Sequence, residues 1–104
     1  MHKVRIVMDD EKIIQYGKKP ETAQAVIDDV LVRQLKLRKE GDEYIGSWSS
    51  VWAGIAYFRK KEWFRIFVKE WEYFTNDYTG NPDDFVCEDL TDGYIDGYEK
   101  VGAM

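Results

Sequence analysis

Aromatic residues are concentrated in one stretch of this 104-residue chain. Twelve of the 16 Trp, Tyr and Phe residues lie between Tyr44 and Tyr78. Burying one such ring completely contributes roughly 1.5–3 kcal/mol to folding, whereas a surface salt bridge contributes under about 1 kcal/mol. We therefore expect this stretch to supply the hydrophobic core. So many aromatic residues also exclude a chain that is disordered throughout.

Residues 50–76 have the clearest helical pattern in the chain. Their apolar positions share one helical face: Trp52, Ile55, Ala56, Trp63, Phe67, Trp71, Phe74 and Tyr78. The hydroxyl of Ser49 or Ser50 would cap such a helix by accepting a hydrogen bond from an early backbone N–H. Charged residues at 59–62 interrupt the apolar face. We therefore predict one bent helix, or two helices joined near residue 60.

The N-terminal third predicts a β-hairpin followed by a helix. Residues 3–8 are rich in β-branched side chains, residues 9–11 are polar as in a turn, and residues 12–16 would form the returning strand. Pro20 suits the first turn of a helix, where its missing N–H costs nothing. Apolar residues at spacings of three and four then predict an amphipathic helix to about residue 33: Ala23, Val26, Ile27, Val30 and Leu31.

Residues 32–48 fit two patterns. Leu35 and Leu37 alternate with polar residues as in a strand, and residues 40–43 have the composition of a turn. We favour a second hairpin, with a helix that continues to Lys39 as the alternative. Further along, a short strand is predicted within the C-terminal part, at Phe85-Val86-Cys87.

These elements predict a single α+β domain over residues 1–104, ending in an acidic, aromatic segment at residues 77–104. The single cysteine excludes a scaffold held by internal disulfides. No run of 18 apolar residues could span a membrane, and the first residues lack the apolar core of a signal peptide. We therefore expect a cytoplasmic protein.

Charge is divided unevenly along the chain. Residues 1–69 contain 14 Lys and Arg against 10 Asp and Glu, whereas residues 70–104 contain one Lys against 10 Asp and Glu. Binding to nucleic acid or to anionic lipid depends on neutralising phosphates with cations. A chain with a net charge of −5 and an acidic end is therefore a poor general binder of either.

The motifs for cofactors and catalysis are weak. Residues 77–88 place oxygen-bearing side chains at spacings that resemble a calcium loop, but Pro82 occupies the position where the turn needs glycine. One His and one Cys cannot close a zinc site. Cys87 has no downstream His to activate it, so we expect a buried or half-buried structural cysteine. We expect no metal, no cofactor and no enzymatic activity.

The C-terminal part favours binding to a protein. Carboxylates there alternate with aromatic rings, which can anchor an interface while the charges speed the encounter. We hypothesise a small acidic inhibitor or accessory protein that covers a basic surface of a partner protein. The candidate contact residues are Asp83, Asp84, Phe85, Asp92, Tyr94, Asp96 and Tyr98. Aromatic residues left over from the core would equally suit a homodimer.

Two alternatives use other residues. A nucleic acid would be held by cations beside aromatic rings, with phosphate contacts and base stacking. The candidates for this basic face are Arg38, Lys39, Arg59, Lys60, Lys61 and Arg65. A small-molecule binder or an enzyme would instead need a concave pocket with converging polar groups. The candidates for lining such a pocket are Trp48, Trp52, Trp63 and Trp71.

Overall fold

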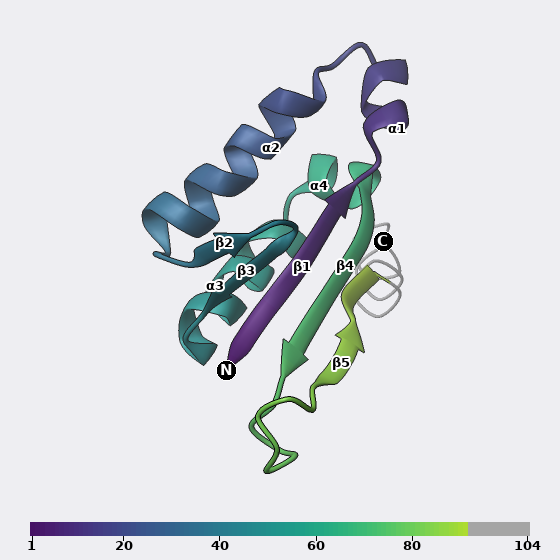
Figure 1. Cartoon of the computed structure of the whole chain (residues 1–104). Coiled ribbons are helices and arrows are strands. Elements are labelled where there is room, and N and C mark those ends of the chain that lie inside the picture. Colours follow the sequence, from purple (N-terminus) through teal and green to yellow (C-terminus); the bar gives the residue numbers. More distant parts are fainter. Residues whose placement is uncertain (92–104) are drawn as a thin grey trace.

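The computed structural model describes residues 1–91, which form an α+β fold on one five-stranded antiparallel sheet (Figure 1). The strands are β1 (His2–Met8), β2 (Arg38–Glu40), β3 (Glu43–Gly46), β4 (Val68–Thr75) and β5 (Val86–Asp89). Their order across the sheet is β2-β3-β1-β4-β5, so the first strand of the chain lies at its centre. The α+β class expected from the sequence is confirmed.

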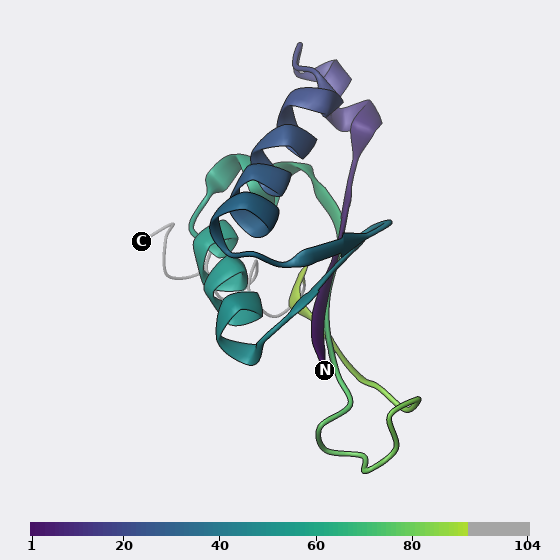
Figure 2. The same ribbon diagram turned by 60° about the vertical axis from the view of Figure 1, so that its left-hand side comes forward.

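The helices cover one face of this sheet. They are α1 (Asp10–Gln15), α2 (Pro20–Asp28), the π-helical η1 (Asp29–Gln34), α3 (Trp48–Arg59) and α4 (Glu62–Phe67). Figure 2 shows α2, α3 and α4 on the same side of the sheet, while α1 continues beyond the end of β1. Within residues 1–91, no helix is both long enough and apolar enough to cross a lipid bilayer.

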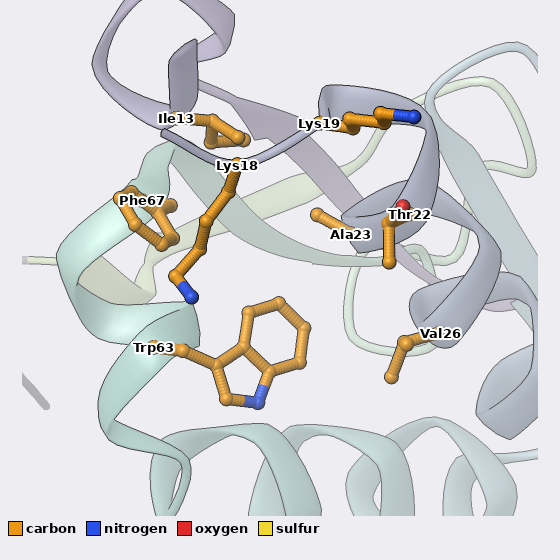
Figure 3. Close-up of a pocket in the computed structure, with 8 residues that line it drawn as sticks. All are labelled: Ile13, Lys18, Lys19, Thr22, Ala23, Val26, Trp63 and Phe67. Carbon is orange, nitrogen blue, oxygen red and sulfur yellow. The ribbon is translucent and has the colours of Figure 1, made fainter. Parts of the chain in front are cut away.

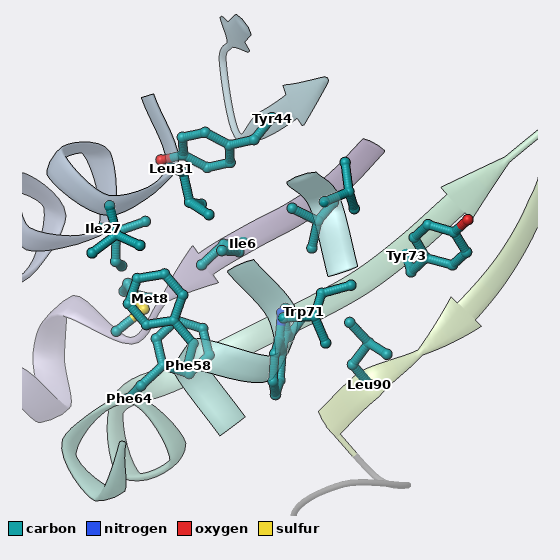
Figure 4. Packing of buried hydrophobic residues seen from close by; sticks show 14 of the residues in the cluster. Ile6, Met8, Ile27, Leu31, Tyr44, Phe58, Phe64, Trp71, Tyr73 and Leu90 are labelled. Atoms are coloured by element: carbon teal, nitrogen blue, oxygen red, sulfur yellow. The ribbon is translucent and has the colours of Figure 1, made fainter. Parts of the chain in front are cut away.

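The core lies between the sheet and these helices (Figure 4). Val4 of β1 is opposite Tyr73 of β4, and Ile6 is opposite Trp71, so alternate residues of both strands face the helices. Six residues of the aromatic-rich stretch belong to the core, as expected: Tyr44, Phe58, Phe64, Phe67, Trp71 and Tyr73. Phe64 packs against both Phe58 and Trp71, with ring centroids 4.7 and 4.9 Å away.

The predicted N-terminal hairpin is wrong in its second strand. Residues 3–8 lie in β1, but residues 12–15 belong to helix α1. The Asp9 carboxylate accepts a hydrogen bond from the backbone N–H of Lys12 (3.1 Å) and caps this helix, and Ile13 is buried in the core. β1 pairs instead with β3 and β4, strands that come much later in the chain.

A second correction concerns the end of the helical segment, because residues 68–75 form strand β4. Trp63, Phe67 and Trp71 are four residues apart, which fits one face of a helix. Trp71, Tyr73 and Thr75 are two residues apart, and all three are buried on one face of the sheet. Trp71 satisfies both periods, so the helical spacing of apolar residues continues after the chain has become a strand.

Other predictions of local structure are confirmed. A helix begins at Pro20, although its last part, Asp29–Gln34, widens into a π-helix. Two helices, α3 and α4, meet near residue 60. The first of them is capped by Ser47, whose hydroxyl accepts from the N–H of Ser50 (3.2 Å), and not by Ser49 or Ser50.

The hairpin predicted within residues 32–48 is also confirmed, as β2 and β3 joined at Gly41 and Asp42. The alternative helix to Lys39 is wrong, since Lys36 has a φ of 62° and Lys39 lies in β2. The strand predicted at residues 85–87 is observed one residue later, as β5.

Candidate functional site

The loop between β4 and β5, residues 76–85, projects beyond the end of the sheet (Figures 1 and 2). We call this loop together with β5, residues 76–89, the acidic hairpin. Gly80 has a φ of 71°, a backbone conformation that favours glycine. The Thr79 hydroxyl lies within 3.1 Å of three backbone carbonyls in the loop, and the Asn76 amide donates to the carbonyl of Pro82 (2.9 Å). These hydrogen bonds define the path of the loop and leave its acidic side chains on the outside.

The acidic hairpin presents negative charge and two apolar side chains to solvent. Residues 76–89 contain five Asp and Glu and no Lys or Arg. Tyr78 is 81% exposed and Val86 is 48% exposed. Asp83 and Asp84 are exposed, and neither carboxylate forms an ion pair with another described residue. The other candidate contact residues, Asp92, Tyr94, Asp96 and Tyr98, lie outside the described residues.

Asp77 has a different environment from Asp83 and Asp84. Its carboxylate lies 2.6 Å from Nε2 of His2 and 3.1 Å from the amino group of Met1. The hydrogen bond from that amino group is the main reason why the pKa of Asp77 is lowered, and His2 adds to the effect. The other ring nitrogen of His2 lies 2.7 Å from the Tyr73 hydroxyl. Asp77 therefore fastens the base of the loop to the start of β1.

Phe85, a candidate anchor for a partner, is half-buried and contacts its own chain. The Lys3 ammonium lies 4.6 Å from the centroid of the Phe85 ring and 5.4 Å from that of Phe74. Lys3 also pairs with Glu43 at 3.0 Å. The Phe85 ring thus covers part of the sheet face opposite the helices. Tyr78, which the sequence pattern placed on the apolar face of the helical stretch, is instead the exposed ring of the hairpin.

On the same open face of the sheet, Cys87 is exposed, so the expectation of a buried or half-buried cysteine is wrong. Its thiol donates a hydrogen bond to Glu72 (3.4 Å). Partial burial raises the pKa of the thiol, and the negative charges of Glu72 and Asp89 raise it further. Arg5 pairs with Glu70 and Glu72 at 3.1 and 2.8 Å. Edge strand β5 is therefore joined to the sheet by polar contacts on this face.

The six basic candidates for a nucleic-acid face occur on different elements. Arg38 and Lys39 lie on β2, and the other four surround the junction of α3 and α4: Arg59, Lys60, Lys61 and Arg65. Arg38 pairs with Glu40 at 3.6 Å, and Lys39 pairs with Asp28 at 2.9 Å. The Lys61 ammonium lies 4.7 Å from the centroid of the Tyr57 ring. Contacts within the chain thus offset part of the positive charge of these residues.

A polar cluster that the sequence patterns missed joins α2 to the sheet. The buried Tyr44 hydroxyl donates to Asp28 (2.6 Å) and accepts from Gln24 (2.7 Å). Lys39 completes the cluster through its ion pair with Asp28. Burial raises the pKa of the Tyr44 hydroxyl strongly, and the hydrogen bond to Asp28 adds to this effect. In the sequence, Asp28 is only one of two adjacent carboxylates, Asp28 and Asp29, and such pairs arise by chance in an acidic chain.

Of the four tryptophans considered for a pocket, Trp63 lines a groove between α1, α2 and α4 (Figure 3). Trp71 is buried in the core, and Trp52 packs against Tyr73 with ring centroids 4.8 Å apart. Trp48 is exposed at the start of α3. Among the described residues, no three His, Cys, Asp or Glu side chains form a group that could hold a metal ion.

Comparisons of the chain with protein-family models, with curated protein sequences and with solved structures gave no match. The basis for a functional proposal is therefore the chain's own geometry. Two features of that geometry stand out: the acidic hairpin with its exposed Tyr78, and the groove beside Trp63.

Proposed function

We propose that this chain is a non-catalytic protein-binding module whose acidic hairpin covers a basic surface of a partner protein, as a small inhibitor or accessory protein does. The observation that carries this proposal is the exposed Tyr78 ring in a segment with five carboxylates and no Lys or Arg. A ring exposed to this degree adds nothing to the core but can fill a pocket on a partner.

The two kinds of side chain have separate roles in this proposal. Tyr78 and Val86 supply the apolar contact at the centre of the interface. Asp83 and Asp84, which have no ion pair among the described residues, attract a cationic surface and speed its approach. The hydrogen bonds of Thr79 and Asn76 hold the loop in one shape, which lowers the entropy lost on binding.

The charges favour a protein partner over a nucleic acid. A nucleic-acid face needs cations that are free to neutralise phosphates. In the described residues, Arg38 and Lys39 already pair with carboxylates, whereas Asp83 and Asp84 do not pair with cations. We therefore assign binding to the acidic surface, and a protein with a basic patch is the partner that matches it.

The proposal is tested by capturing partners and then measuring their affinity. The tagged chain is incubated with a lysate of its native cells at low and at high salt, and bound proteins are identified by mass spectrometry. The protein captured at low salt is purified and titrated calorimetrically against the wild type, the double variant Asp83→Asn/Asp84→Asn and Tyr78→Ala. We expect a basic protein whose affinity falls with salt and falls at least about tenfold in both variants.

A matched control removes two negative charges elsewhere. Glu11 and Glu21 are exposed on α1 and α2, and the double variant Glu11→Gln/Glu21→Gln has the same net charge as the hairpin variant. This control should retain the wild-type affinity. Capture of no basic protein, or equal affinity of the captured protein for the hairpin variant and the wild type, would overturn the proposal.

A further inference from the structure

A groove lies between α1, α2 and α4 (Figure 3). Figure 1 shows these helices toward the end of the molecule opposite the acidic hairpin. Its volume is about 450 Å³. Pockets for small molecules commonly have volumes of about 300–1,000 Å³. The residues that line the groove are Ile13, Lys18, Lys19, Thr22, Ala23, Val26, Trp63 and Phe67. They come from three helices and one connecting loop, so the groove is a product of tertiary packing.

The walls of the groove are apolar and held in place. The half-buried Trp63 ring packs edge-to-face on Phe58 and Phe64, with ring centroids 6.1 and 5.9 Å away. Phe67 is buried at the base, and Val26 is 40% exposed on α2. An apolar side chain left open to water on a rigid wall gains free energy when a ligand covers it.

Both charged residues of the lining are lysines. Lys18 and Lys19 follow Gly17, whose φ of 76° allows the chain to turn from α1 into α2. Figure 3 shows the Lys18 side chain extending toward Trp63, and that of Lys19 lying above Thr22. Neither ammonium group forms an ion pair with another residue of the described chain. The lining itself contains no Asp or Glu.

We propose that this groove binds an amphipathic monoanion, a medium-chain carboxylate of the fatty-acid class. Its apolar chain would cover Trp63, Val26 and Phe67, and its carboxylate would pair with the Lys18 ammonium, which extends toward Trp63. Lys19 adds positive charge at the other side of the groove. A cationic ligand would be repelled by the lysines, and a neutral one would leave both charges without a counter-ion. This binding activity is separate from the proposed protein interface, because the groove shares no residue with the acidic hairpin.

The test uses decanoate, at concentrations below those at which it forms micelles, and the full chain. Titration calorimetry gives the affinity, and the Trp63 indole N–H signal in nuclear magnetic resonance spectra, assigned with Trp63→Phe, reports the place of binding. Decanol serves as the neutral analogue. We expect decanoate to shift the Trp63 signal and to bind roughly tenfold more weakly to Lys18→Gln/Lys19→Gln, whereas decanol binds both proteins equally.

Two further variants keep this test decisive. Lys36→Gln/Lys69→Gln removes two exposed charges outside the groove and should bind decanoate as the wild type does. Val26→Glu places a carboxylate on an exposed helical position of the groove wall, and it should bind decanoate at least tenfold more weakly, by like-charge repulsion. If the Trp63 signal does not respond to decanoate, or if the Lys18→Gln/Lys19→Gln protein binds it with wild-type affinity, the inference is wrong.

Discussion

At the scale of single residues, the buried Tyr44 hydroxyl is satisfied by two side chains, Asp28 and Gln24. Tyr44 is 1% exposed, so water cannot replace either partner. Tyr44→Phe removes the donor to Asp28, and we expect the free energy of unfolding in urea to fall by about 1–2 kcal/mol. Tyr57→Phe, at an exposed ring of α3, should change it by less than about 0.5 kcal/mol. Equal stability of Tyr44→Phe and the wild type would show that the hydrogen bond contributes nothing.

The same cluster predicts a dependence of stability on pH. Partial burial raises the pKa of Asp28, but hydrogen bonds from Tyr44, Lys39 and Gln24 outweigh this effect and hold the pKa below its ordinary value of 3.8. Folding therefore favours the charged carboxylate, so Asp28 stabilises the fold above its unfolded pKa. This stability is lost as the pH falls through the lowered pKa.

Asp28→Asn should consequently lower the melting temperature more at neutral pH than at a pH well below the ordinary aspartate pKa. Thermal unfolding followed by circular dichroism at both pH values measures this difference. Asp83→Asn, at an exposed position of the acidic hairpin, corrects for the change in net charge. If Asp28→Asn lowers the melting temperature by the same amount at both pH values, the charged Asp28 carboxylate is not the source of this stability.

Cys87 shows how a neighbouring carboxylate controls an exposed thiol. Since partial burial, Glu72 and Asp89 all raise the thiol pKa, little reactive thiolate is present at neutral pH. We expect Glu72→Gln to increase the rate of alkylation by iodoacetamide severalfold, measured by mass spectrometry. Glu70→Gln is the matched control, because Glu70 also pairs with Arg5 but does not contact the thiol. If both variants react at the same rate, Glu72 does not suppress the thiolate.

At the scale of elements, α3 packs closely on η1 at Gly54. A Cβ atom on Gly54 would lie 2.4 Å from Cδ2 of Leu31, which is fully buried. Gly54→Ala gains about 1 kcal/mol of helix propensity, but overpacking a core costs about 1–3 kcal/mol. We therefore expect a net loss of stability of about 1 kcal/mol in urea unfolding.

The effect of Gly54→Ala on the free energy of unfolding should change sign when the Leu31 side chain is shortened. In a Leu31→Ala background the contact with Cδ2 is gone, so Gly54→Ala should be stabilising through helix propensity alone. The double-mutant cycle compares the four proteins in urea. If Gly54→Ala destabilises both backgrounds equally, close packing on Leu31 is not the cause.

The sequence predicted those elements whose signals are local. Pro20 with an apolar repeat predicted α2, and the turn residues at 40–43 predicted β2 and β3. Local signals were misleading where pairing is long-range. β1 is completed by β3 and β4, so the predicted neighbour at residues 12–16 was not needed as a strand. Trp71 fitted both a helical and a strand period, and only its position opposite Ile6 decides between them.

At the scale of the whole molecule, the candidate sites were partly predictable. The concentration of negative charge near the C-terminal end is visible in the sequence, and Asp83 and Asp84 are exposed as expected. The sequence does not show that Lys3 covers Phe85, because the two residues are far apart in the chain. The groove could not be predicted either, since its lining runs from Ile13 to Phe67 and only the packing of three helices brings it together.

The separation of the acidic hairpin from the core leads to a last prediction. Replacing residues 78–84 with Asn-Gly shortens the loop but keeps the contacts of Asn76 and Asp77 with the N-terminal residues. We expect the free energy of unfolding in urea to change by less than about 1 kcal/mol, since the closure entropy of a loop varies slowly with its length. Binding to a basic partner should be lost and decanoate binding retained, because Tyr78, Asp83 and Asp84 are removed while the groove is untouched. A loss of more than about 2 kcal/mol would instead make the loop a part of the folding core.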